Sequence, residues 1–226
     1  MKNLFYFILI VIPFIGCKKY ECAKEECAEG LLKAEIPSTI NRIVITEGNG
    51  TFHLRKQSET AFFFPGGWIH DHGYNKFTIS GNTLTIKNTF SDSYISLISL
   101  DGIEIVDGNS TTYVSTSFAH GSMEMSIGGN ATIFFDDVCG DEGNNEVTPR
   151  SSDFDLELNV HQNGTLHGYA VGFRNVDANV YSNGTVRVAV EDQLTVNIPS
   201  NGTLYYKGSP VISSSIGFQG SLIDEN

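Results

Sequence analysis

The sequence predicts an all-β fold, a solenoid of parallel strands stacked in coils of about 18–20 residues. Two observations carry this prediction. The first is composition: the chain has 23 Gly but only 6 Pro, and only 18% of its residues are charged. Such a composition is typical of many short strands joined by tight turns. The second observation is a turn sequence that recurs at nearly constant spacing in the last third of the chain.

The recurring turn is Asn-Gly-Thr followed by an apolar residue, at residues 163–166, 183–186 and 201–204. Its copies are 20 and 18 residues apart, and each follows a strand-like alternation such as Leu156-Glu-Leu-Asn-Val160. A degenerate fourth copy stands at residues 220–222. One repeat cannot bury its own apolar side, whereas stacked repeats can, at a strand spacing of about 4.8 Å. We expect Asn-Gly to supply the positive φ that these turns need.

Stacking in register would place Val160, Val180 and Ile198 on one inner face and Tyr181 on the opposite face. A meandering sandwich with Asn-Gly hairpins is the competing interpretation, because it needs the same alternating strands. The constant period and the repeated tetrapeptide favour the coil, since hairpins alone require only strands and varied turns.

The earlier part of the chain carries the same strand–turn–strand pattern with less regularity. Turns are predicted at residues 47–50, 80–82 and 128–130, each between two apolar alternations. Residues 136–153 interrupt the series with Gly, Asn, Pro and acidic residues, and they predict a long loop inserted between two coils.

The N-terminus has the pattern of an export signal. A positive start is followed by residues 4–15, which are apolar apart from Pro13 and too few to span a bilayer. Gly16-Cys17 then resembles the lipobox of bacterial lipoproteins, with Phe14 where Leu is usual. Cleavage there would leave Cys17 as an acylated N-terminus that anchors the protein to a membrane. An ordinary secretory signal and an N-terminal anchor helix are the alternatives.

These features divide the chain into a signal peptide at residues 1–16, a tether at 17–35 and a single β domain at 36–226. The mature chain keeps three further cysteines, which are Cys22, Cys27 and Cys139. Three is odd, so at most one disulfide forms, and both a local bridge and a bridge to Cys139 are allowed. No fourth ligand stands at a spacing that suits zinc.

Several segments match the motifs of one known family. Residues 40–54 and 81–86 are similar to its opening strands, and residues 154–204 to its repeated turns. The closing segment is the most specific match: Leu204-Tyr-Tyr-Lys-Gly-Ser-Pro-Val211, followed by Ile216-Gly-Phe-Gln-Gly220. The chain thus resembles the head GIN domain family of auto-transporter adhesins, a family common in exported proteins of Bacteroidetes. The family's Ser-Gly-Ser-Gly turns appear here as Ser-Asn-Gly-Thr.

The resemblance covers roughly residues 36–223. It implies a right-handed, parallel β-helix-like solenoid at the cell surface or in the periplasm. It brings no catalytic residues with it, and the name adhesin adds little about a ligand.

Charge and motif spacing exclude several classes of site. The formal net charge is −12 and the chain has no basic footprint, which excludes a nucleic-acid partner. His70 and His72 share one strand face, but a third ligand is missing. The acidic pairs at 136–137 and 141–142 lack a calcium-loop register. We therefore expect neither a metal site nor a cofactor.

Two groups of residues are candidates for function. Trp68, beside two glycines and followed by His70 and His72, is a candidate ligand contact. Asp153, Asp155 and Glu157 alternate onto one strand face, as carboxylates in a glycan-cleaving groove would. These carboxylates begin a strand whose other face is apolar, so we interpret them as a solvent face and expect no enzyme. The scattered histidines, His161 among them, are interpreted as surface residues.

The sequence therefore predicts a non-catalytic, adhesin-like binding module of the cell envelope. A lipid on Cys17 would anchor it to the outer membrane, facing the periplasm or the surface. Its ligand would be a glycan or a surface protein. A glycan-processing β-helix enzyme and a purely structural envelope protein are the alternatives.

Overall fold

A computed structural model of the protein describes residues 31–65, 77–87, 92–136 and 153–226. The prediction of an all-β fold is confirmed, because these residues form strands β1 to β17 and one short 3-10 helix, Thr116–Phe118. None of the described residues forms a helix long and apolar enough to cross a membrane.

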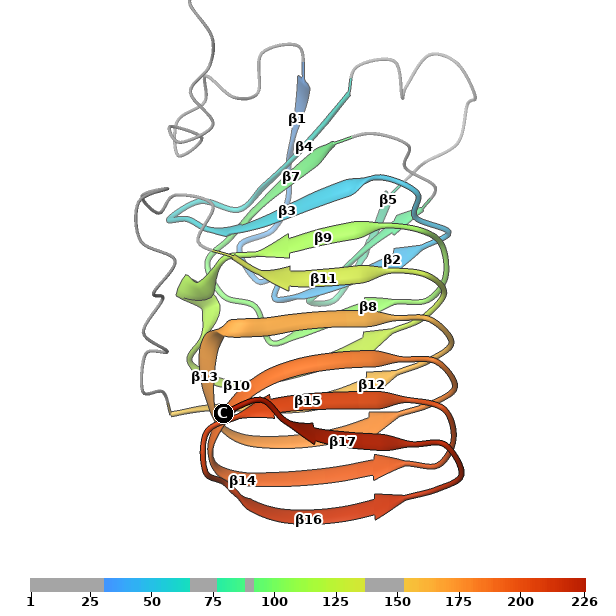
Figure 1. The fold of residues 1–226 in the computed structure, drawn as a ribbon. Helices are drawn as coiled ribbons and strands as arrows, with labels where there is room; N and C mark the ends of the chain where they lie inside the picture. The colour runs from blue at the N-terminus through green and yellow to red at the C-terminus, as the bar shows by residue number, and fades with distance from the viewer. Residues whose placement is uncertain (1–30, 66–76, 88–91, 137–152) are drawn as a thin grey trace, which may run out of the picture.

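The strands stack in two rows (Figure 1), which we name face A and face B. Face A contains β6 (Thr83–Lys87), β2 (Arg42–Thr46), β8 (Gly102–Ile105), β10 (Gly121–Ile127), β12 (Phe154–Val160), the second halves of β13 (Thr165–Val180) and β14 (Thr185–Ile198), and β16 (Val211–Ile216). Face B contains β7 (Ser93–Leu97), β3 (Thr51–Lys56), β9 (Thr111–Val114), β11 (Thr132–Phe135), the first halves of β13 and β14, β15 (Thr203–Lys207) and β17 (Ser221–Asp224). Within each face, neighbouring strands pair in parallel. One face A strand, its turn and the following face B strand make one coil.

Alternation of apolar and polar residues places the core between the two faces. In β12, Phe154, Leu156, Leu158 and Val160 are buried, while the residues between them face outward. Val160 pairs with Val180, and Val180 and Ile198 are both fully buried. The inner register predicted for the last third of the chain is therefore present.

At the end of the stack that contains the N-terminal strands, which we call the first end, the coils do not stack in the order in which they occur along the chain. Strand β2 pairs with β6 on one side and with β8 on the other. The chain therefore leaves the β2–β3 coil, runs through β4 (Ala61–Pro65) and β5 (Phe77–Ser80), forms the β6–β7 coil, and returns to β8 on the far side of β2. The regular succession of coils in the last third of the chain does not extend to this end.

Antiparallel strands close the same end, so the sheet is mixed. β1 (Leu31–Glu35) pairs antiparallel with β4, β4 with β7, and β5 with β6. A wholly parallel sheet was wrong here, because β5 and β6 form the tight hairpin of the competing interpretation around Gly81, which has φ 59°. β1 also lies inside the range assigned to the tether, and the sheet therefore begins before residue 36.

The repeated Asn-Gly turn works differently from the prediction. In the first two copies, positive φ falls on the residue before Asn, at Gln162 (55°) and Ser182 (53°). The glycine is needed for space, since a Cβ on Gly184 would lie 2.7 Å from Cγ1 of Val160. The asparagines form a ladder between coils, in which Nδ2 of Asn183 donates to Oδ1 of Asn163 at 3.1 Å. Steric room and this ladder, rather than the backbone conformation of Asn-Gly, explain the motif.

Candidate functional site

The residues that directly follow the face A strands form an outer row beside the turns, at the right-hand edge of Figure 1. We name Val106, Gly128, His161 and Tyr181 the turn row. Parallel hydrogen bonding continues into it: the N–H of Gly128 donates to the Ile105 carbonyl at 2.7 Å, and the N–H of His161 to the Ile127 carbonyl at 2.8 Å. Successive positions of the row are therefore one strand spacing apart, about 4.8 Å.

Two rings of the turn row stack on each other. The centroids of His161 and Tyr181 are 4.9 Å apart, and their planes differ by 1°. Tyr181 is half-buried and covers one face of the imidazole, while the other face points along the row toward Gly128. The imidazole is thereby held in a fixed orientation with one face uncovered by the row.

Gly128 interrupts the row and leaves a groove between Val106 and His161. The whole groove has a volume of about 480 Å³ and continues past His161, because Gln162, Tyr181 and Ser182 also line it. Glu104 and Ser126 lie along it, two residues before Val106 and Gly128 in the chain. In the described part of the chain, neither the Glu104 carboxylate nor the Ser126 hydroxyl has a hydrogen-bond or ion-pair partner. The groove thus combines an apolar wall, a ring face and two hydrogen-bonding groups.

Backbone packing keeps the gap open. A Cβ on Gly128 would lie 2.3 Å from the carbonyl oxygen of Val106, much closer than real contacts allow. That oxygen belongs to the backbone of the neighbouring coil and cannot rotate away as a side chain would. The groove is therefore a fixed feature of two stacked turns.

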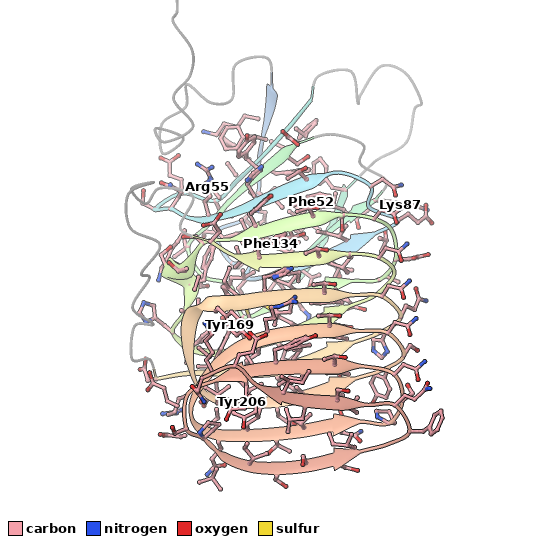
Figure 2. All side chains as sticks on the ribbon, in the orientation of Figure 1. Phe52, Arg55, Lys87, Phe134, Tyr169 and Tyr206 are labelled. Atoms are coloured by element: carbon pink, nitrogen blue, oxygen red, sulfur yellow. The ribbon has the colours of Figure 1, made fainter. Side chains whose placement is uncertain are left out.

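A second row of rings runs along the outside of face B. Its members are half-exposed planar groups on successive coils: Tyr94, His53, Tyr113, Phe134, His167, Arg187 and Tyr205. We name it the ring row, and Figure 2 labels Phe134 within it. Centroids are 4.6 Å apart for His53 and Tyr94 and 4.5 Å apart for Phe134 and His167.

The ring row presents edges rather than faces to a ligand. The planes of Phe134 and His167 differ by only 3°, so each ring covers its neighbour's face. Burial, with a smaller contribution from the Arg55 charge, lowers the pKa of His53 to about 4. Burial likewise lowers the pKa of His167. These histidines are neutral at pH 7 and act as rungs of a stabilising stack, in contrast to the uncovered ring of His161.

Of the three carboxylates weighed for catalysis, Asp155 is held in a structural ion pair. Asp155 accepts hydrogen bonds from Nε of Arg174 at 3.0 Å and Nη2 at 2.5 Å, and from Nδ2 of Asn175 at 2.9 Å. The Arg174 hydrogen bond is the main cause of the lowered pKa of the Asp155 carboxyl. A carboxylate that is kept ionised and occupied by a guanidinium is a poor general acid or base. Among the described residues, no three His, Cys, Asp or Glu side chains gather as metal ligands would.

The residues that the sequence marked for function fall outside the described ranges. They are Cys17, Cys22, Cys27, Trp68, His70, His72 and Cys139. Conversely, His161 looked like one of several scattered surface histidines. Aligning the turns at 128–132, 161–165 and 181–185 would have placed Gly128, His161 and Tyr181 in one row.

Comparison with known proteins agrees with this architecture. The family model of the "Putative auto-transporter adhesin, head GIN domain" matches residues 72–210. A "putative adhesin" of Bacteroides fragilis has a similar structure, with a TM-score of 0.57 at 13% identity, over 86% of this chain and 96% of that one. At this identity the likeness shows the fold alone.

Two proteins of Parabacteroides distasonis are also similar in structure. A "putative adhesin" gives a TM-score of 0.47 at 13% identity, over 86% of this chain and 95% of that one. A "putative lipid binding protein" gives 0.45 at 15% identity, over 87% and 97%. No curated protein matches the sequence.

Proposed function

Because the chain belongs to the head GIN domain family of auto-transporter adhesins, we propose that it is a non-catalytic binding module of the cell envelope, with its ligand held in the groove beside Gly128. One observation carries this proposal. The groove offers an uncovered imidazole face, fixed from behind by Tyr181, next to a gap that the backbone keeps free of side chains.

The form of the groove suits reversible recognition. It is open to solvent, with Val106 and His161 as walls and Glu104 and Ser126 as polar groups. Binding sites commonly pair apolar walls with a few placed hydrogen-bonding groups. The strands of face A continue on both sides of the groove, so a ligand larger than the groove can extend along neighbouring coils.

The second part of the proposal concerns the cellular location of the protein. Cleavage before Cys17 and acylation of this residue would anchor a right-handed solenoid to the outer membrane through a tether. Support comes from the short apolar segment that ends at Gly16-Cys17 and from the family's link to exported adhesins. Metabolic labelling with a fatty acid should mark the protein, and Cys17→Ala should abolish the label. Label that survives this substitution would contradict the anchor.

A binding screen tests the groove. The full chain, purified in detergent, is applied to arrayed envelope glycans, lipids and surface proteins. The His161→Ala variant removes the uncovered ring, and His167→Ala removes a ring of similar size from face B, on the other side of the stack. We expect His161→Ala to weaken the strongest interaction by about tenfold or more, which corresponds to about 1.4 kcal/mol. The His167→Ala control should bind like the unaltered protein. Equal binding by both variants would place the function elsewhere.

A further inference from the structure

Gly128 contributes no side chain to the turn row, and the size and chemistry of the resulting gap indicate which ligand fills it. Resting on the proposed function, we propose that the ligand is a saccharide, and that one neutral pyranose ring of it occupies the level of Gly128 between Val106 and His161.

The height of the gap fits a puckered ring. Val106 and His161 are two strand spacings apart, about 9.6 Å, so one level of about 4.8 Å is unfilled. Within the row, the occupied neighbouring level has a spacing of 4.9 Å between the His161 and Tyr181 centroids. Two flat rings already stack at this spacing, so the level has room for a flat ring and also for a thicker, puckered one. A pyranose ring carries hydrogen atoms on both faces and is correspondingly thicker.

The two walls match the two faces of such a ring. The π face of an aromatic ring is electronegative, and the C–H groups of a sugar are polarised by their neighbouring oxygens. The uncovered face of His161 therefore attracts the C–H face of a pyranose. On the other side, Val106 is 49% exposed and offers an apolar surface to the opposite face. Tyr181 lies behind His161, so the imidazole loses little freedom when the ligand binds.

The polar edge of the groove selects a neutral sugar. The Glu104 carboxylate accepts hydrogen bonds from sugar hydroxyls, and hydrogen bonds to an ionised acceptor are the stronger kind. Ser126 can donate or accept beside it. The same carboxylate repels an acidic sugar, as does the chain's formal net charge of −12. Neutral hexosides should therefore bind, and the matching uronides should not.

The test uses the full chain in a zwitterionic detergent that has no sugar headgroup. Methyl glucoside, methyl galactoside, methyl mannoside and methyl N-acetylglucosaminide are added singly, and saturation-transfer NMR detects contact with their ring protons. Methyl glucuronide and methyl galacturonide are the acidic counterparts. We expect transfer to at least one neutral glycoside and none to its uronide. Transfer should be lost in His161→Ala and reduced several-fold in Glu104→Gln, and it should persist in His167→Ala.

Melting curves of the three variants show whether each is folded, so that lost transfer reports on the groove. The outcomes separate this inference from the function on which it rests. If no neutral glycoside shows transfer, or if transfer persists in His161→Ala, the pyranose assignment is wrong. If an envelope component then binds the unaltered protein but not His161→Ala, the groove remains a binding site for another ligand class. If no binding depends on His161, the proposed function fails as well.

Discussion

The two ends of the stack finish in different ways (Figure 1). At the first end, β1, β4 and β5 run antiparallel to their partners, and Phe62, Phe64 and Phe77 pack together with centroids 5.1 to 6.0 Å apart. Phe62 is fully buried. At the other end, Ile212 and Ile216 of the last coil are 40% and 41% exposed. Their partners one coil earlier, Leu194 and Ile198, are fully buried.

The difference shows what parallel stacking supplies and what it does not. Each coil buries its apolar side only against its neighbours, so the repeat itself has no way to end. Strand edges also leave a row of unpaired backbone groups. At the first end, the chain changes direction, and antiparallel strands cover the outermost coil, β6–β7. At the C-terminal end, β16 has no strand on its outer side within the described residues.

The largest loss of stability should come from placing Asp at an inner position between two coils, compared with the same substitution on the last coil. Val180, Ile198 and Ile216 occupy the same inner register on successive coils. Val180→Asp buries a charge between two coils and should lower the free energy of unfolding by at least about 4 kcal/mol. Ile216→Asp makes the same change on the open coil and should cost about 1 kcal/mol or less. Urea unfolding measures both, and equal losses would mean that the last coil is covered.

The last third of the chain was predictable because its information is local. An alternating strand and a repeated turn recur together, and this pattern alone predicts the shared inner register of Val160 and Val180 that the structure has. The closed end was not predictable in this way. β2 lies between β6 and β8. No pattern in the sequence near β2 indicates that a strand from later in the chain, β6, will pair with the outer side of β2.

The candidate site was missed for a related reason. Gly128-Gly129 looked like an ordinary turn, and His161 like a scattered histidine. Only the stacking register brings the gap at one coil next to the ring of another. Features of a single coil are thus visible in its own sequence, whereas features shared by two coils require the register between them.

The closed end itself should be sensitive to loss of a ring. Phe62→Ala removes a fully buried side chain that meets Phe77 edge-on at 5.5 Å. Such a truncation leaves a cavity and should cost about 3–4 kcal/mol. Val211→Ala, on the open coil, changes a side chain that is 76% exposed and should cost a few tenths of a kcal/mol. Urea unfolding should separate the two, and a loss below about 1 kcal/mol for Phe62→Ala would show that the antiparallel strands contribute little.

The ring row should make the closed end sensitive to pH. Burial lowers the pKa of His53 to about 4 from the ordinary 6.5, so the folded chain keeps this ring neutral where the unfolded chain protonates it. The stabilisation is complete above about pH 6.5 and is lost as the pH falls toward about 4. We expect a loss of about 2 kcal/mol, because His53 is only partly buried. In His53→Gln this part of the pH dependence should disappear, and an unchanged slope between pH 4 and 6.5 would assign it to other groups.

The smallest effect should appear at the open end. Phe218 is 80% exposed in the turn of the last coil, so folding buries little of its apolar surface. Phe218→Ser should therefore change the free energy of unfolding by less than about 0.5 kcal/mol, as expected for a surface position.

The measurement needs the full chain at two protein concentrations. A loss above about 1.5 kcal/mol at both concentrations would mean that other residues of the same chain cover this coil. A loss that grows with concentration would instead mean that a second copy covers it, since association stabilises the folded state by mass action. A near-zero change at both concentrations would leave the last coil open, as the exposure of Ile212 and Ile216 implies.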